Sequence, residues 1–413
     1  MISFDFKSGY HHIDIHSASQ TFLGFCWKGP QDRLCRYFVF TVLPFGLASA
    51  PYIFTKCLKP LEKYWRIQGV KIALFLDDGW IIEHVLHECK QVAREIRSDL
   101  NKAGFITNDE KSVWQPCQSI TWLGLIWNTS TVTICITEQR HASITNTIEN
   151  IFRKKFYVSA RETASLVGKI ISAGTVFGKI SRIMTRYCSI AVAAAQDWDS
   201  KFVLDDYSTR ELTFWRENIQ RINVKKIDSL PVTSNYVIYS DASATGCGAH
   251  FDLNGEQICH KQWTMLEQGK SSTWRELSAI EFALESFLSM LKGSYIKWFS
   301  DSQTACRIVQ VGSMRKDLHI IAIRIFQLCV DHHIELDIQW IPRTEIEKAD
   351  YISRMIDIDD WQITQSCSNY LDSVWGKHTV DCFANYYNKK ISRFFSWHWN
   401  PDCAGVDFFV QNL

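Results

Sequence analysis

Acidic residues stand where the sequence predicts strand ends and the tip of a hairpin. The segment FLDDGW at residues 75–80 closes the apolar run KIALFL and predicts a β-hairpin with Asp77 and Asp78 at its tip. Asp5 ends a short strand predicted over residues 2–6. If that strand lies beside the hairpin, three carboxylates meet at one sheet edge. Aspartate and glycine are also ordinary turn residues, so this stretch alone leaves both interpretations open.

Three carboxylates at one edge would need a cation. Two unit charges about 4 Å apart repel by about 4 kcal/mol at an effective dielectric constant near 20. Oxygen ligands alone favour Mg²⁺, which keeps water ligands and accepts substrate phosphates. Two such ions, about 3.5–4 Å apart, would activate an attacking hydroxyl and stabilise a leaving oxygen. The first acidic set therefore predicts metal-dependent phosphodiester chemistry.

A second acidic set lies in the C-terminal half, spaced by 35, 25 and 49 residues along the chain. Its members are expected on a strand, a helix, a strand end and a helix: Asp241, Glu276, Asp301 and Asp350. If they converge, the same electrostatic argument requires cations, and two Mg²⁺ ions suit in-line attack of water on a phosphodiester. Taken singly, Glu276 and Asp350 fit surface charges on helices just as well.

The composition limits the class of protein. With 413 residues the chain can form two or three domains, each with its own core. An apolar content of 46% and a charged content of 22% are typical of globular proteins. The net charge of +1 neither indicates nor excludes a nucleic-acid partner, because the local distribution of charge matters more.

Cysteine spacing and hydropathy indicate the compartment. None of the 14 cysteines forms a CxxC pair, which excludes zinc ribbons and thioredoxin-like motifs. Scattered cysteines are typical of buried thiols in a reducing compartment. No apolar run reaches the ~18 residues of a membrane span, and the N-terminus does not resemble a signal peptide. We therefore expect an intracellular protein, cytoplasmic or nuclear, with no membrane partner.

The first 137 residues predict an α+β sheet with helices on one face. Beside residues 2–6 and the hairpin, strands are expected at 21–27, at 35–42 and in the segments SITWLGLIW and TVTICIT. One helix is expected over residues 48–64, where Pro60 should kink or shorten it. Another is expected over residues 84–102, with Gly104 at its end.

Residues 138–228 change to a helical and basic pattern. Ser159 and Glu162 form a capping box, S-x-x-E, before an apolar-periodic run. Between Gln139 and Tyr187, nine Lys or Arg residues stand against two acidic ones. Three of the basic residues are spaced three and four apart, which predicts one helix face: Lys179, Arg182 and Arg186. This face is either simply solvated or follows a phosphate backbone.

Residues 229–235, SLPVTSN, look like a linker. The pattern over residues 232–356 then predicts a mixed α/β sheet covered by helices. Its strands are expected at 236–241, 246–252, 256–263, 295–300 and 334–341, and its helices at 273–290, 301–310, 314–331 and 346–355. Residues 357–413 form a less periodic C-terminal extension, rich in Trp and Asp.

Five motifs, in order, resemble those of retroelement reverse transcriptases: FDFKSGY, LPFGLASAP, FLDD, NDEKSVW and WLG. The resemblance implies that Asp5 and Asp77 bind metal, with Asp78 as an accessory catalytic carboxylate. It also implies an RNA template, a DNA primer and deoxynucleoside triphosphates (dNTPs) as partners. Residues 1–137 would then be the palm of such an enzyme, and residues 138–228 its thumb or connection.

The same motifs imply roles in substrate binding. Tyr10 matches the aromatic steric gate that would clash with a ribose 2′-hydroxyl, although it also fits an ordinary core aromatic. Phe45 and Gly46 belong to a motif resembling the one that shapes the nucleotide pocket, and Lys111 resembles a lysine near the triphosphate. The WLG segment resembles the turn that grips the primer end: Trp122, Leu123 and Gly124.

The sequence departs from this family in one respect. Only four residues precede Asp5, whereas the family has a fingers region there, with basic residues that hold the triphosphate. We therefore expect a partial palm with the fingers missing, from a fragment of a longer polyprotein or a decayed copy. Polymerase activity of such a chain should be impaired.

The order Asp–Glu–Asp–Asp in the second set resembles type 1 ribonuclease H. The resemblance implies cleavage of RNA in RNA–DNA hybrids, with all four carboxylates as catalytic metal ligands. It places Gln303 at the minor groove of the hybrid, where 2′-hydroxyls distinguish RNA from DNA. Many such enzymes carry a His before the last Asp. The loop IPRTEIEKAD has none, so product release could be slower or Arg343 could substitute. An integrase-type nuclease shares the fold, but its late Glu does not match.

Two further segments indicate the type of element. GKIISAGTVFGKISRIMTRY and VDCFANYYNKKISRFFSW resemble retrotransposons of the DIRS type, which use a tyrosine recombinase, and a gypsy-like element is the second choice. Residues 357–413 resemble the start of a methyltransferase-like segment. Asn400, Pro401 and Asp402 do not match its catalytic motif, so we assign this extension no activity.

Together these features predict a retrotransposon reverse transcriptase with ribonuclease H. Two Mg²⁺ ions, or Mn²⁺, would act at each site, and the rest of the element's polyprotein would be a partner. The alternative is a non-catalytic nucleic-acid-binding remnant of a decayed or domesticated element.

Overall fold

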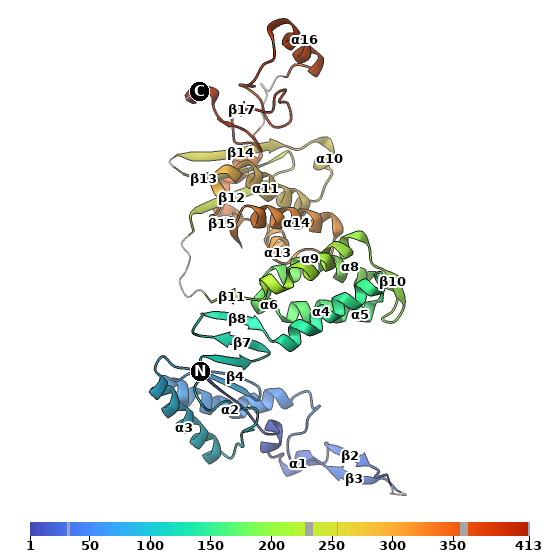
Figure 1. Ribbon diagram of the computed structural model, residues 1–413, viewed down its shortest axis with the longest axis vertical. Coiled ribbons are helices and arrows are strands. Elements are labelled where there is room, and N and C mark those ends of the chain that lie inside the picture. Colours follow the sequence, from blue (N-terminus) through green and yellow to red (C-terminus); the bar gives the residue numbers. More distant parts are fainter. Residues whose placement is uncertain (31–33, 228–233, 254, 356–361, 412–413) are drawn as a thin grey trace. The chain divides into compact units, whose positions relative to one another are not determined.

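The computed structural model describes residues 1–30, 34–227, 234–253, 255–355 and 362–411 (Figure 1). The chain divides into two compact units: unit 1 is Met1–Ala142 with Arg221–Asp228, and unit 2 is Ser143–Gln220 with Ser229–Leu413. Of the linker-like segment 229–235, only the last two residues lie within the described part. Within that part, no helix combines the length and hydropathy needed to cross a bilayer.

Unit 1 contains a three-stranded antiparallel sheet of order β1-β5-β4. The strands are β1 (Ile2–Asp5), β4 (Lys71–Phe75) and β5 (Asp78–Ile82), and two helices accompany them, α2 (Ala50–Ile67) and α3 (Leu86–Lys102). Ile2, Phe4 and Ile81 are buried in one cluster with residues of both helices. Helices on one face of the sheet are therefore confirmed. Helix α2 continues through Pro60 to Ile67, so of the two expected effects, a kink or a shortening, the shortening is wrong.

The remaining strands of unit 1 form two further sheets. One has the order β11-β8-β7-β6, and the other is the hairpin of β2 and β3. Their bounds are β2 (Gly24–Trp27), β3 (Arg36–Val39), β6 (Ser119–Trp122), β7 (Leu125–Asn128), β8 (Thr133–Ile136) and β11 (Lys225–Lys226). Two short helices, η1 (Gly9–His12) and α1 (Ser17–Gln20), follow β1. The strands expected from the sequence are thus present.

A helical segment precedes the large sheet of unit 2. Its elements are α4 (Glu138–Arg153), β9 (Tyr157–Ser159), α5 (Ala160–Ser172), α6 (Gly174–Phe177), α7 (Ile180–Ile183), α8 (Arg186–Ala194), β10 (Lys201–Val203) and α9 (Asp206–Ile222). The predicted capping box is confirmed, because the Ser159 hydroxyl accepts from the Glu162 N–H and the Glu162 carboxylate accepts from the Ser159 N–H.

Unit 2 is centred on a five-stranded sheet of order β14-β13-β12-β15-β16. Strands β14, β13 and β12 are antiparallel, whereas β12, β15 and β16 are parallel. The strands are β12 (Tyr236–Ala242), β13 (Gly246–Asp252), β14 (Glu256–Gln262), β15 (Tyr295–Ser300) and β16 (Glu335–Trp340). The helices are α10 (Met265–Gln268), α11 (Ser272–Ser286), α12 (Leu288–Leu291), α13 (Gln303–Val311), α14 (Lys316–Asp331), η2 (Arg343–Glu345) and α15 (Glu347–Ser353). The predicted mixed sheet covered by helices is confirmed.

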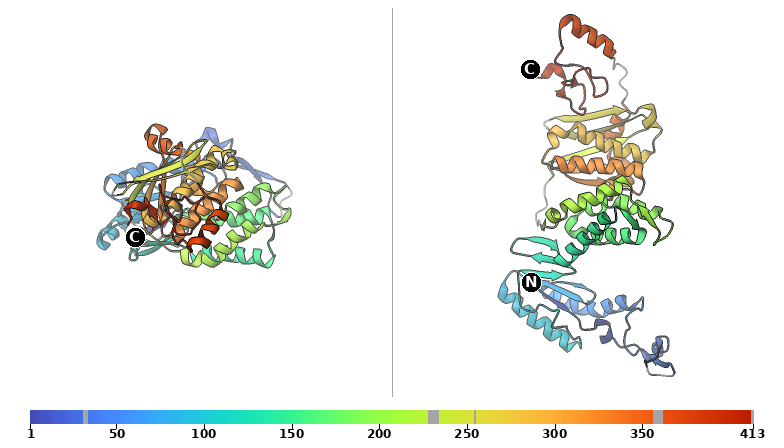
Figure 2. Two further views of the ribbon diagram at one scale, coloured as in Figure 1. Left: turned by 90° about the horizontal axis from the view of Figure 1, so that it is seen from above. Right: turned by 45° about the vertical axis from the view of Figure 1, so that its right-hand side comes forward.

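Helices pack on both faces of this sheet. On β13, Cys247, Ala249 and Phe251 are buried with residues of α11, α13 and α14, and Figure 2 shows α11 and α14 side by side against the strands. Gly246 and Gly248 alternate with them and approach α15 instead. The two faces therefore carry different helices, and α15 lies against the face on which β13 has Gly246 and Gly248.

The C-terminal extension joins the edge strand β14. Its elements are α16 (Gln365–Trp375), β17 (Phe395–Ser396), β18 (Gly405–Val406) and η3 (Phe408–Val410). The Trp399 backbone N–H donates to the Ile258 carbonyl at 3.0 Å, and its indole N–H donates to the Gln257 side chain at 2.7 Å. This part of the chain is packed against the sheet.

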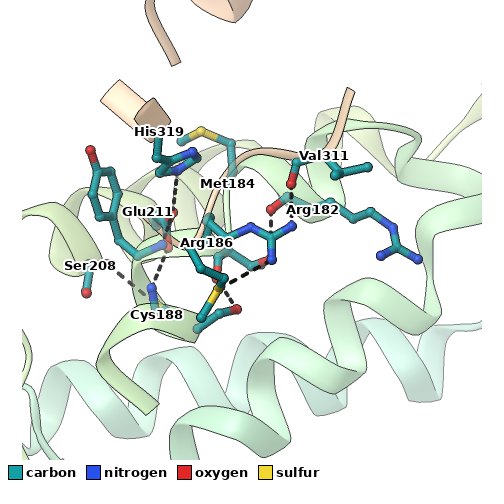
Figure 3. A network of polar contacts seen from close by, with 12 residues as sticks. Arg182, Met184, Arg186, Cys188, Ser208, Glu211, Val311 and His319 are labelled. Carbon is teal, nitrogen blue, oxygen red and sulfur yellow. Dashed lines mark hydrogen bonds and ion pairs between the residues drawn. The ribbon is translucent and has the colours of Figure 1, made fainter. Parts of the chain in front are cut away.

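A buried polar network joins the helical segment to the helices of the sheet (Figure 3). The Glu211 carboxylate on α9 accepts hydrogen bonds from the backbone N–H groups of Tyr187 and Cys188, at 2.8 and 2.9 Å. The His319 ring on α14 is fully buried, with Nε2 3.8 Å from the same carboxylate. Arg186 donates to the Val311 carbonyl at the end of α13. Both parts of unit 2 therefore share one interior.

Candidate active sites

The first acidic set lies at one end of the β1-β5-β4 sheet. Asp5 and Asp78 are directly opposite each other in the antiparallel ladder, so their side chains point to the same face. That face is opposite to the one covered by helices, because Phe4 and Phe6 alternate with Asp5 and are buried. Asp77 lies in the turn that precedes Asp78. The strand that ends at Asp5 therefore lies beside the hairpin, as expected.

The turn itself differs from the sequence prediction by one residue. Asp78 and Gly79 already belong to β5, so the two turn residues are Leu76 and Asp77. Leu76 has φ of 54°, a left-handed conformation that costs a non-glycine residue about 1–3 kcal/mol. Gly79 serves packing instead of the turn, because a Cβ there would lie under 3.0 Å from the Phe4 ring.

Burial and mutual repulsion act on the first acidic set. Burial raises the pKa of Asp5 and of Asp78, and the Asp77 charge adds to both shifts. The Lys111 ammonium opposes them and is the cation that acts on both groups. Among the described residues, these carboxylates do not form a set of three with ligand atoms all within 4.8 Å. The three carboxylates are therefore neighbours at one end of the sheet, but their oxygen atoms are not all close enough to share one metal ion as they stand.

Two polar residues near Asp5 escaped the sequence prediction. The Ser112 hydroxyl accepts from the Asp5 backbone N–H at 3.1 Å, and the Asn108 backbone N–H donates to the Asp5 carbonyl at 2.7 Å. Both lie in the segment that carries Lys111, so they tie that segment to β1. No periodicity in the sequence could have indicated this pairing.

Of the residues predicted to form the nucleotide pocket, Tyr10 and Phe45 are in contact. The Tyr10 ring lies 4.8 Å from the Phe45 ring and 5.3 Å from the Phe54 ring, centroid to centroid. Phe45 is 60% exposed, and Gly46 follows it with φ of 90°. Tyr10 is therefore in contact with both a buried core ring and an exposed one.

The predicted primer-gripping segment forms a tight turn between β6 and β7. Leu123 and Gly124 both have positive φ, at 51° and 72°, as a two-residue hairpin turn of type I′ requires. Trp122 stacks on Trp80 of the acidic hairpin, with ring centroids 5.3 Å apart. The turn is thereby connected to the strand that carries Asp78.

Three of the four members of the second acidic set lie together. Oxygen atoms of Asp241, Glu276 and Asp301 all lie within 4.8 Å of one another. Asp241 on β12 is 3% exposed and Glu276 on α11 is 8% exposed, while Asp301 directly follows β15. Parallel pairing of β12 and β15 brings the ends of these strands together. The three carboxylates therefore come from separate elements and meet at one end of the sheet.

The electrostatics of this set fit a divalent cation. Burial raises the pKa of Glu276 well above its usual value, and the charges of Asp241 and Asp301 add to the shift. Burial also raises the pKa of Asp241, although a hydrogen bond from Ser353 opposes the shift. One oxygen of Glu276, Oε2, is buried without any protein partner. An all-oxygen donor set of this kind suits Mg²⁺ or Mn²⁺.

Asp350 is near the set but is not one of its three members. Its Oδ1 accepts from Arg343 and, at 2.9 Å, from Arg354. Burial alone would raise the pKa of Asp350, but the hydrogen bonds from both arginines hold it below the usual value. Arg343 stands in the loop that lacks a His, so the structure places a cation beside the last Asp.

Sequence patterns missed Ser353, although a signal existed. Residues three apart share a helix face, and Ser353 follows Asp350 at that spacing on α15. Its hydroxyl lies 2.8 Å from Asp241 Oδ2. Gln303, predicted to touch the hybrid, is the first residue of α13 and is exposed, two residues after Asp301.

The predicted basic helix face is wrong. Residues 179–186 do not form one helix: α7 ends at Ile183 and α8 begins at Arg186. Lys179 donates to the Leu336 carbonyl at 2.8 Å, and Arg186 is half-buried against Val311 (Figure 3). Arg182 is exposed, and among the described contacts its side chain makes no such hydrogen bond to the part of unit 2 that contains the five-stranded sheet. Turn formation at Met184 and Thr185 interrupts the spacing that suggested one face.

Comparisons with known proteins agree with the first part of this description. Residues 1–127 match the family model described as "Reverse transcriptase (RNA-dependent DNA polymerase)". The Gag-Pol polyprotein of Gibbon ape leukemia virus is 26% identical over 125 residues, which are 30% of this chain and 7% of that protein. The retrovirus-related Pol polyprotein from transposon 412 of Drosophila melanogaster is 24% identical over 306 residues, 70% of this chain and 22% of that protein.

A solved structure of the foamy viral protease-reverse transcriptase in complex with RNA/DNA hybrid aligns with a TM-score of 0.46 and 18% identity, covering 88% of this chain and 46% of that one. The chain spans only a small part of the Pol polyproteins that it matches. By the sequence matches, residues 1–127 are similar to reverse transcriptase domains, and the chain is similar to parts of retroviral and transposon Pol polyproteins.

Proposed function

We propose that this chain is the reverse transcriptase and ribonuclease H part of a retrotransposon Pol polyprotein. Unit 1 carries the palm, the helical segment of unit 2 the connection, and the five-stranded sheet the ribonuclease H domain. One observation carries the nuclease assignment: Asp241, Glu276 and Asp301 converge within 4.8 Å, with an unpartnered buried oxygen on Glu276. A buried cluster of three carboxylates needs cations to remain ionised.

The side chains divide the work at the nuclease site. Asp241, Glu276 and Asp301 would hold the metal group, which when bound supplies water activation and leaving-group stabilisation. Asp350, which forms an ion pair with Arg343, would be the fourth carboxylate of the set. Gln303 would contact the minor groove of the RNA–DNA hybrid.

The palm site would perform RNA-templated DNA synthesis. Asp5 and Asp77 would hold the metal ions, with Asp78 beside them, and Lys111 would lie near the triphosphate of the incoming dNTP. We assign the element to the DIRS type, with a gypsy-like element second, and expect the protein to act inside the cell.

A hybrid-cleavage assay tests the nuclease. The full chain should cut the RNA strand of an RNA–DNA hybrid in Mg²⁺ or Mn²⁺ and leave double-stranded DNA intact. The variants Asp241→Asn and Asp301→Asn should abolish the cut while folding normally. Cleavage that survives both substitutions, or no cleavage with either metal, would leave a nucleic-acid-binding remnant as the better description.

A further inference from the structure

Two glycines let α15 approach the central strands of the nuclease sheet. A Cβ at Gly248 would lie under 3.0 Å from Ile352, including its backbone carbon at 2.8 Å. A Cβ at Gly246 would lie 3.0 Å from the Ser353 carbonyl oxygen. Any side chain at these positions would push α15 away. The sequence thus places the last turn of α15 directly against the strand that pairs with Asp241.

This approach brings a buried hydroxyl to Asp241. Ser353 is fully buried, and its Oγ lies 2.8 Å from Asp241 Oδ2 and 2.8 Å from the Asp350 carbonyl oxygen. A serine hydroxyl has one proton to donate, and a carboxylate is a stronger acceptor than a neutral carbonyl. The proton therefore favours Asp241.

A second serine fixes the backbone that carries this hydroxyl. The Ser243 hydroxyl donates to the Ser353 carbonyl at 2.7 Å and accepts from the Gly246 N–H at 3.0 Å. The end of α15 is thus bonded to the turn between β12 and β13. Ser353 is held from its backbone and cannot move without breaking this bond.

We propose that Ser353 is a positioning residue for the nuclease site. Its hydroxyl holds Oδ2 of Asp241, which fixes the carboxylate plane and makes the other oxygen available toward Glu276 and Asp301. Partners that orient metal ligands are worth about 10–100-fold in metal affinity or activity. This role rests on the proposed nuclease function and extends it to a residue that does not touch the reacting atoms.

The test uses Ser353→Ala in the full chain and reads Mn²⁺ binding by electron paramagnetic resonance, without substrate. We expect Mn²⁺ affinity to fall about 10–100-fold. In the cleavage assay, half-maximal activity should need correspondingly more metal, and saturating metal should restore part of the rate. The matched control is Ser286→Ala, which removes another buried hydroxyl, bonded to the Phe282 carbonyl at 2.8 Å on α11.

A merely structural role would lower the thermal stability of Ser353→Ala and Ser286→Ala alike and leave Mn²⁺ affinity at its native value in both. That result would overturn the proposal. If Ser353→Ala does not fold, Ser353→Cys decides, because a thiol nearly fills the same space but donates weakly. Native Mn²⁺ affinity in Ser353→Cys would contradict the role.

Failure of the proposed nuclease gives a different pattern. If the native chain cuts no hybrid yet binds Mn²⁺, and both Asp301→Asn and Ser353→Ala weaken that binding, the positioning role stands while the nuclease assignment falls. If the native chain cuts hybrid and Ser353→Ala has native metal dependence, the nuclease stands and the positioning role falls.

Discussion

The molecule carries two acidic sets that differ in how they are supported. In unit 1, Asp5 and Asp78 face each other across one ladder, and Lys111 offsets part of their repulsion. In unit 2, Asp241 and Glu276 are buried, and burial is the largest cause of the raised pKa of each. A half-exposed set can remain ionised in water, whereas a buried one must take up protons or metal. The second set is therefore built for metal before any substrate arrives.

The difference follows from the elements that carry each set. The unit 1 carboxylates lie on β1, on β5 and in the turn before β5, on the face of the sheet opposite to the buried cluster with α2 and α3. The unit 2 carboxylates come from two strands and α11, and α15 adds Ser353 from the other side. In unit 2 a helix and the Ser353 hydroxyl restrict the carboxylates in addition to the strands. The unit 2 carboxylates are therefore better preorganised for a metal ion than those of unit 1.

Removing one carboxylate from each set should separate them most strongly. Asp301→Asn should lower hybrid cleavage by about 10²-fold or more, because a metal ligand supplies several kcal/mol of transition-state stabilisation. It should also abolish Mn²⁺ binding without substrate. Asp5→Asn should leave both properties native and reduce only primer extension. Equal loss of substrate-free Mn²⁺ binding in both variants would contradict the comparison.

The buried network of unit 2 should contribute the largest single stability term of the side chains compared. Glu211→Ala leaves the backbone N–H groups of Tyr187 and Cys188 without their acceptor, at a cost of about 3 kcal/mol. Glu149→Ala removes an ion pair with Arg216, whose side chains are 31% and 47% exposed, and should cost under about 1 kcal/mol. Urea unfolding followed by circular dichroism measures both. If both variants lost a similar free energy of unfolding, the buried network would not stabilise unit 2 more than a surface ion pair does.

The helices and strands could be predicted well from the sequence because the signals for them are local. Strand periodicity, the capping box at Ser159 and the glycine after α3 each depend on neighbouring residues, and each was confirmed. Convergence of Asp241, Glu276 and Asp301 could be expected only from the family resemblance, because it depends on parallel pairing across 60 residues.

The failures have equally specific causes. The tip of the hairpin was predicted at Asp77 and Asp78, but the turn residues are Leu76 and Asp77: Gly79 makes room for Phe4, and Leu76 takes the left-handed conformation. The basic face failed because spacing alone does not reveal the break between α7 and α8. Ser353 was missed because its spacing of three from Asp350 places it on the same helix face but does not show that its hydroxyl reaches Asp241 on another element.

The two packing glycines offer a matched pair of substitutions. Gly248→Ala forces α15 away from β13, and Gly79→Ala forces the buried Phe4 ring away from β5. Each should destabilise its own unit by about 1–3 kcal/mol. Gly248→Ala should also slow hybrid cleavage, because Ser353 moves with α15, whereas Gly79→Ala should leave the cleavage rate native. If a folded Gly248→Ala variant cleaved hybrid at the native rate, the position of α15 would not matter for the nuclease site.

The smallest expected effect is the pH dependence of metal stabilisation. Folding raises the pKa of Glu276 and of Asp241, in each case chiefly through burial, so the metal-free folded chain holds protons that the unfolded chain releases. Stability of the metal-free protein should therefore be full below the ordinary carboxylate pKa and fall as the pH rises through the raised values. Divalent metal binds the ionised form and offsets that loss. The melting temperature should accordingly rise on adding Mg²⁺ by roughly a few degrees at pH 8 and by less at pH 6.

Glu276→Gln provides the control for this last measurement, because an amide neither titrates nor attracts the metal as a carboxylate does. The variant should show a flatter pH profile and a smaller Mg²⁺ shift at both pH values. Asp78→Asn in unit 1 removes a group whose pKa is also raised, by burial first and then by Asp77 and Asp5, but Lys111 already lowers it. Its Mg²⁺ shift should stay close to that of the native chain. If Asp78→Asn removed the shift and Glu276→Gln kept it, the metal would be held in unit 1, and the ranking of the two sets would be reversed.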